Sequence, residues 1–183
     1  SCENTVKSVS RIFYGLPINS YVAIDLEAIE ILTDKVGGVT LTPQVDFNYG
    51  SDVFAAGKEV TLKGNAARSF VQSRDIDKLS SNEDRMARQK QFMTAFFKSA
   101  FAKTKENITF PVDVYSSVSK YMITDIDIAE ISFFASCVLK GGGSLTYKSI
   151  EGETVMGEKH AEHYVKDDSV YNTILDVFYK PVD

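Results

Sequence analysis

A change of hydrophobic period between residues 19 and 43, which read NSYVAIDLEAIEILTDKVGGVTLTP, constrains the fold more than any other feature. Residues 21–24 alternate their side chains between two faces, as a short strand does. Asp25 occupies an N-cap position, and the apolar residues after it recur at helical spacing. Gly37 and Gly38 supply a left-handed helix stop before the β-branched run VTLT. The segment predicts a strand, a helix and a second strand, which is typical of an α/β fold.

The rest of the chain predicts further elements around this unit. Strands are expected at residues 59–64, 108–115 (ITFPVDVY) and 144–150 (SLTYKSI). Helices are expected from residue 65 toward residue 74, from Ser80 or Ser81 onward, from Thr124 or Asp125 to residue 140, and from Ser169 onward. No repeat or linker divides the 183 residues. We therefore expect one domain, 1–183, with a central mixed β-sheet and helices packed on it.

The helix that begins near Ser80 or Ser81 joins a basic end to an apolar stripe. Its first residues, SSNEDRMARQKQF, fit a capping box and complement the helix dipole with acidic side chains. On a helical wheel, Arg85, Gln89, Phe92 and Phe96 share one edge. Arg85 is therefore expected on the border of the core, and Arg88 projects from the same end a little further round.

Two interpretations fit this basic end. In an ordinary amphipathic helix, rim arginines pair with Glu83 and Asp84. In an anion site, the planar guanidinium binds phosphate through two hydrogen bonds, and the N–H groups of the helix start assist. Arg74, in VQSRDID, would bring a third guanidinium, and three arginines suit a pyrophosphate better than a carboxylate. The aromatic stripe has two matching interpretations: a core face, or an apolar groove that ends at the anion.

Composition excludes some functions. A formal net charge of −5 argues against a nucleic-acid-binding surface spread over the protein. No stretch approaches the roughly 20 apolar residues that span a bilayer. His160 and His163 have a spacing that can suit a metal, yet no third ligand of the right type follows, so a solvated surface pair is expected and no metal site is assigned to this chain.

Three segments resemble the LytR-CpsA-Psr family between about Ile12 and Tyr179. GLPINSYVAIDLEAIEILTDKVGGVTL is similar to the strand–helix–GGV–strand unit of that family. VTLKGNAARSFVQSRD is similar to its L-x-G-x-x-A-L-x-Y-x-R-x-R segment, and NEDRMARQKQF to its D-x-x-R-x-x-R-Q helix start. The last two segments at this spacing are the most specific part of the resemblance.

The resemblance implies a phosphotransferase that moves a glycopolymer, such as teichoic acid or capsule, from a polyprenyl pyrophosphate carrier to a peptidoglycan acceptor. It implies that Arg74, Arg85, Arg88 and Gln89 bind the pyrophosphate with help from Mg²⁺, and that Arg85 is the catalytic residue. Phe92 and Phe96 become candidates for a lipid groove. The implied location is the extracytoplasmic face of the bacterial membrane, reached through an N-terminal anchor that is not in this chain, and no nucleic acid is an expected partner.

The sequence departs from the family pattern in three ways. Gln72 stands where the family usually has an arginine, and Asn82 where it usually has an aspartate. The chain also begins about one third of the way into the family domain, after the segment whose arginine and aspartates hold magnesium. We therefore expect this chain alone to bind without turnover. A non-catalytic envelope module that binds a polyprenyl carrier or a cell-wall polymer is the alternative function.

Overall fold

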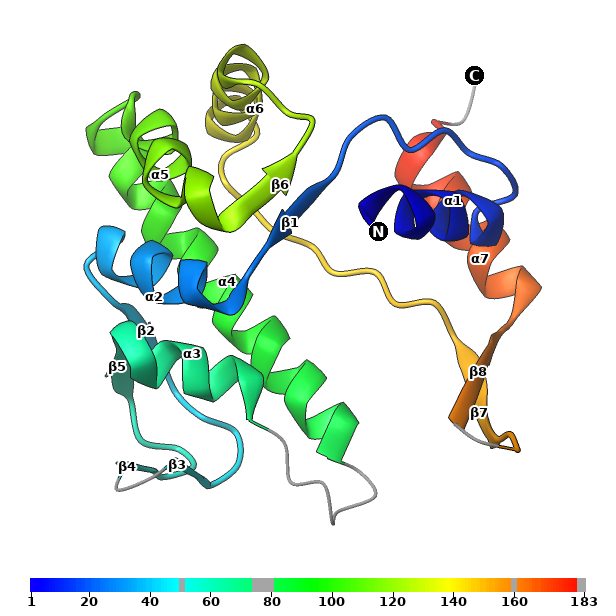
Figure 1. The fold of residues 1–183 in the computed structure, drawn as a ribbon, viewed down its shortest axis with the longest axis horizontal. Coiled ribbons are helices and arrows are strands. Elements are labelled where there is room, and N and C mark those ends of the chain that lie inside the picture. Colours follow the sequence, from blue (N-terminus) through cyan, green and yellow to red (C-terminus); the bar gives the residue numbers. More distant parts are fainter. Residues whose placement is uncertain (50–51, 74–80, 159–160, 181–183) are drawn as a thin grey trace. The chain divides into compact units, whose positions relative to one another are not determined.

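Helices and short strands alternate along the chain, which confirms the predicted α/β class (Figure 1). The structure, a computed structural model, describes residues 1–49, 52–73, 81–158 and 161–180. The chain divides into two units. Val22–Leu145 form the larger unit, and Ser1–Tyr21 with Thr146–Asp183 form the smaller one. Each unit is described by itself, and the larger one contains the predicted site residues.

The larger unit is built from short strands and longer helices. In chain order its elements are β1 Val22–Ile24, α2 Leu26–Lys35, β2 Val39–Leu41, β3 Phe47–Tyr49, β4 Asp52–Phe54, β5 Val60–Leu62, α3 Gly64–Gln72, α4 Ser81–Glu106, α5 Phe110–Val118, a 3-10 turn Ser119–Tyr121, β6 Met122–Thr124 and α6 Ile128–Lys140. The strands pair antiparallel, β1 with β6, β2 with β5 and β3 with β4. Across the described ranges these pairs stay two-stranded, whereas one central sheet was predicted.

The predicted strand–helix–strand unit forms, with the predicted helix cap and helix stop. Asp25 is the N-cap of α2, and its Oδ1 accepts a hydrogen bond of 2.9 Å from the N–H of Glu27. α2 ends just before Gly37 and Gly38, whose φ angles of +86° and +108° favour glycine. A Cβ on Gly38 would lie 2.7 Å from Thr61 Cγ2, so glycine also allows β2 to start close to β5.

The core of the larger unit lies where α3 and α4 meet the β2–β5 and β3–β4 pairs. Its buried members are Val36, Val39, Leu41, Phe54, Leu62, Ala67, Phe70, Val71 and Phe92. The rings of Phe47, Phe54 and Phe70 pack on one another with centroids 5.7–6.4 Å apart. Each large side chain buried here contributes about 1.5–3 kcal/mol. This cluster fixes α3 against the N-terminal half of α4.

Two predicted elements differ in the structure. Residues 108–115, expected to be a strand, contain the start of α5, because Pro111 fits the first turn of a helix, where no N–H partner is needed. α6 begins later than expected, after Asp127. The Asp127 carboxylate accepts from the N–H of Glu130, and the Glu130 carboxylate accepts from the N–H of Asp127, which completes a capping box.

The smaller unit consists of α1 Cys2–Ile12, a β-hairpin of β7 Gly152–Met156 and β8 Ala161–Val165, and α7 Asp167–Phe178. The strand expected at 144–150 is absent from the structure, and β7 starts at Gly152 instead. α7 begins two residues before Ser169, whose hydroxyl accepts from the N–H of Glu151 and so ties the helix to the hairpin.

Candidate functional site

The predicted anion-binding residues lie where the first turns of α4 meet the end of α3. α4 begins at Ser81, one of the two start positions that the sequence predicts; the other, Ser80, lies outside the described residues. Arg85, Arg88 and Gln89 are all on its first three turns. Arg74 lies outside the described residues, so the expectation that it shares a cleft with Arg85 and Gln89 stays a prediction.

Arg88 is the buried member of this group, with 9% of its surface exposed. Its Nε donates to the carbonyl of Phe70 at 2.9 Å, and its Nη2 donates to the carbonyl of Ser73. The guanidinium also lies over the Phe47 ring, 4.9 Å from the centroid. Burial lowers the pKa of Arg88, while Asp84 raises it and Arg85 lowers it. Arginine stays charged under such shifts, so a cation is held at the end of α3.

Gln89 contacts the same end of α3. Its Nε2 donates to the carbonyl of Val71 at 3.1 Å. The last carbonyls of a helix have no partner within the helix. Two adjacent side chains of α4 therefore cap three carbonyls at the end of α3, those of Phe70, Val71 and Ser73. This places the donors of Arg88 and Gln89 against the main chain immediately before residue 74.

Arg85 differs from Arg88 because its guanidinium is only partly used. Nη2 donates to Asn82 Oδ1 at 2.8 Å, one turn earlier on the same helix. Nε is buried and has no hydrogen-bond partner among the described residues. A buried N–H without an acceptor is costly and calls for an explanation. With respect to the described residues, Arg85 thus keeps donor capacity at a half-buried position one turn before Arg88.

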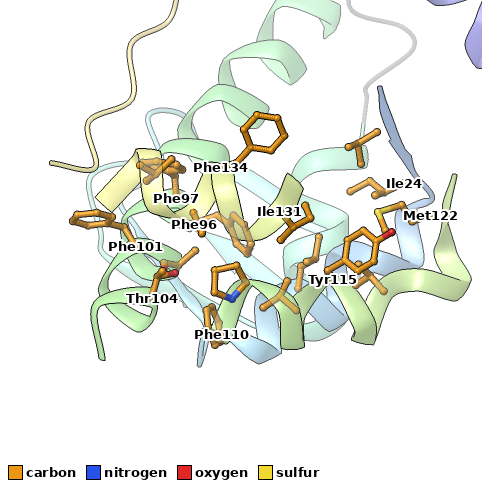
Figure 2. A pocket seen from close by; sticks show the side chains of 18 residues that line it. Ile24, Phe96, Phe97, Phe101, Thr104, Phe110, Tyr115, Met122, Ile131 and Phe134 are labelled. Atoms are coloured by element: carbon orange, nitrogen blue, oxygen red, sulfur yellow. The ribbon is translucent and has the colours of Figure 1, made fainter. Parts of the chain in front are cut away.

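An apolar cavity of about 380 Å³ lies further along the same unit (Figure 2). Its lining consists of Val22, Ile24, Leu32, Phe96, Phe97, Ala100, Phe101, Thr104, Phe110, Pro111, Val114, Tyr115, Val118, Met122, Ile131, Phe134, Ala135 and Val138. No charged residue belongs to this set. The hydroxyl of Thr104 donates to the carbonyl of Ala100 and that of Tyr115 to the carbonyl of Ile126, so both polar groups are satisfied.

The two predicted groove residues have different positions. Phe96 lines the cavity. Phe92 is 5% exposed and belongs to the core, with its ring stacked on that of Phe96 at 6.2 Å. Sequence reasoning missed the walls from α5 and α6. Ile131, Phe134 and Val138 recur at helical spacing on α6, and that pattern could have indicated a second apolar wall.

Neither a metal-binding cluster nor a membrane-spanning helix is found among the described residues. Across the described ranges, no group of three or more His, Cys, Asp or Glu side chains gathers to hold a metal ion. The magnesium that the family resemblance implies stays a prediction. His163 Nδ1 is hydrogen-bonded to Thr154, and His160 lies outside the described residues. Within the same ranges, no helix has the length and apolar character to cross a bilayer.

The sequence and the fold were then compared with known proteins. The profile of the LytR_cpsA_psr family matches residues 2–176. The polyisoprenyl-teichoic acid–peptidoglycan teichoic acid transferase TagU of Oceanobacillus iheyensis is 27% identical over 172 residues, which are 93% of this chain and 51% of that protein. The chain therefore spans about half the length of this relative.

Solved structures with the same fold extend the comparison. A transcriptional regulator from Enterococcus faecalis superimposes with a TM-score of 0.76 at 17% identity, covering 93% of this chain and 62% of the other. TagT bound to LI-WTA superimposes with a TM-score of 0.65 at 17% identity, covering 94% of this chain and 64% of the other. These likenesses establish the fold. With a profile match over almost its entire length, the chain belongs to the LytR-CpsA-Psr family.

Proposed function

We propose that this chain binds a polyprenyl-pyrophosphate-linked glycan and serves the transfer of that glycopolymer to peptidoglycan. One observation carries the proposal: α4 bears a partly unused arginine at its start and a wall of the apolar cavity further along. Arg85 and Phe96 are 11 positions apart, which is roughly 16 Å along a helix at about 1.5 Å per residue. An amphipathic ligand with an anionic head and an isoprenoid tail matches both features.

The physical chemistry of the two regions supports this ligand class. Apolar surface moved from water into the cavity contributes about 25 cal/mol per Å². The guanidinium of Arg85 suits the head, since it forms short charge-assisted hydrogen bonds with phosphate oxygens. Arg74 is proposed as a second phosphate ligand on the family pattern. Arg88 and Gln89 are proposed to support the head group while they hold the end of α3.

The proposed reaction is a phosphoryl transfer. A hydroxyl of the peptidoglycan acceptor loses its proton and bonds to the phosphorus next to the glycan, while the bond from that phosphorus to the bridging oxygen breaks. Polyprenyl phosphate leaves. Such a transfer needs positioning and charge neutralisation more than covalent help. Arg85 would neutralise charge on the leaving phosphate. We place this activity on the extracytoplasmic face of the membrane, with teichoic acid or capsule as the polymer.

Calorimetry with a short-chain polyprenyl pyrophosphate tests the binding site. Arg85→Ala should lower the affinity by about 1.5–3 kcal/mol, roughly 10- to 150-fold, because a charged hydrogen-bonding partner is lost. Arg68→Ala is the matched control, since Arg68 pairs with Glu30 at 3.1 Å and lies on α3. Inorganic pyrophosphate and a polyprenol of equal length separate the contributions of head and tail. Equal affinities of the wild type and Arg85→Ala would refute the site.

A release assay separates the enzyme from a non-catalytic module of the envelope. The purified chain is incubated with a polyprenyl-pyrophosphate glycan, magnesium and a peptidoglycan acceptor. Polyprenyl phosphate released above a no-protein control, and lost in Arg85→Ala, identifies a transferase. Binding without release identifies a carrier-binding module.

A further inference from the structure

The turn after α6 contains two glycines that differ in what surrounds them. Gly142 and Gly143 both have positive φ angles, +76° and +68°. A Cβ on Gly142 would meet nothing within 4 Å. A Cβ on Gly143 would lie 2.5 Å from Cδ2, Cε2 and Cζ of Phe101. Carbon atoms in contact prefer about 3.5–4.0 Å, so the Phe101 ring occupies space that any other residue at 143 would need.

Phe101 is a wall of the apolar cavity, whereas Gly143 is not part of the lining. A side chain at residue 143 would therefore meet the ring of a cavity wall, although Gly143 itself is not among the lining residues. Lys105 Nζ lies 5.8 Å from the centroid of the same ring. Figure 2 shows Phe101 at one end of the labelled side chains, with Ile24 and Met122 at the other.

We propose that Gly143 and Phe101 form an end wall that sets the depth of the apolar cavity, and through it the length of isoprenoid tail that the cavity takes. The second half of this inference rests on the proposed function. A methyl group at residue 143 must displace the ring away from the turn. Because Gly143 lies outside the lining, that displacement moves the ring toward the cavity and shortens it.

The glycine pair supplies a matched test. Alanine at either position strains a left-handed backbone, but only alanine at 143 meets the ring. Calorimetry is performed on the wild type, Gly143→Ala, Gly142→Ala and Phe101→Ala with polyprenyl pyrophosphates of increasing tail length. Wild-type affinity should rise with length to a plateau. Gly143→Ala should reach its plateau at a shorter tail, losing about fourfold for each methylene group that no longer fits. Gly142→Ala should keep the wild-type plateau, and Phe101→Ala should move it to longer tails.

Identical plateaus in Gly143→Ala and the wild type would overturn the inference while leaving the proposed function intact. If the wild type binds no carrier, the proposed function fails. Crystal structures of Gly143→Ala and Gly142→Ala then test, without any ligand, whether Gly143 and Phe101 form the end wall. A Phe101 ring displaced into the cavity in Gly143→Ala alone supports the end wall. An unmoved ring refutes it. Phe101→Leu replaces Phe101→Ala if the larger truncation fails to fold.

Discussion

Replacing Arg88 by methionine should destabilise the protein strongly although an arginine at a helix start is usually a surface residue. Each hydrogen bond from a charged donor contributes about 1.5–3 kcal/mol, and the variant loses the bonds to Phe70 and Ser73. Methionine also removes the cost of burying a charge, which offsets part of this loss. The expected net loss is about 2–4 kcal/mol. For a chain of this size, that corresponds to a fall in Tm of roughly 5–15 °C.

Arg85→Met is the matched control on the same helix. Arg85 donates a hydrogen bond of 2.8 Å to Asn82 near the surface, and its buried Nε has no acceptor among the described residues. Its removal should cost less than about 1 kcal/mol. Arg88→Lys should fall between the two, because lysine keeps the charge but lacks the fork that reaches two carbonyls.

Thermal unfolding followed by circular dichroism measures all three variants. Carrier binding by calorimetry is measured in parallel at a temperature where each variant is folded. The expected pattern is a large loss of stability for Arg88→Met and a large loss of affinity for Arg85→Met. If Arg88→Met unfolds at the wild-type temperature, the carbonyl contacts contribute no net stability, and the capping role of Arg88 is refuted.

The remaining predictions concern other side chains. Phe92→Ala should lower the free energy of unfolding in urea by about 3–5 kcal/mol, since Phe92 is buried in the core. Phe96→Ala should lose less stability than Phe92→Ala but more affinity for the carrier tail. If Phe96→Ala loses more stability and Phe92→Ala more affinity, the assignments of core residue and cavity wall must be exchanged. Gln89→Leu should lose about 1 kcal/mol of stability in the same assay, because the hydrogen bond to the carbonyl of Val71 is lost, and wild-type stability would argue against the capping role. The hydrogen bond to Glu162 raises the pKa of Tyr164, and desolvation adds to the shift. This contribution is present below the ordinary tyrosine pKa of about 10 and is lost as pH rises through the raised value, so Tyr164→Phe should show a smaller alkaline loss of Tm than the wild type.

Local chemistry allowed the first strand–helix–strand unit to be predicted from sequence. The Asp25 cap and the glycine stop act within a few residues of their own helix, and both appear in the structure. The prediction of a strand at residues 108–115 was wrong, because local preference did not decide the structure there. Their β-branched residues favour a strand, but Pro111 at the first turn and packing of α5 against α2 and α6 favour a helix. Contacts with distant elements decided between the two.

In the candidate site, contacts with distant elements also decide which single side chains are buried, and the sequence does not show those contacts. A helical wheel placed Arg85 at the border of the core and Arg88 further round, yet Arg88 is the buried one. The wheel treats one helix alone, whereas the carbonyls that accept from Arg88 belong to the end of α3 and its C-cap, 18 and 15 positions earlier. The cavity was foreseen only through Phe96, because the facing walls come from elements far along the chain.

The contact of Arg88 with the end of α3 has an electrostatic consequence. The C-terminus of a helix carries roughly half a negative charge from its aligned peptide dipoles, and such an end repels anions. The Arg88 guanidinium places a full positive charge against two of those carbonyls. The charge of Arg88 exceeds the partial charge of the helix end and opposes it, while Asp84 acts in the other direction. The repulsion that this helix end alone would exert on a phosphate is thereby reduced, and the reduction is provided by a side chain that need not touch the ligand.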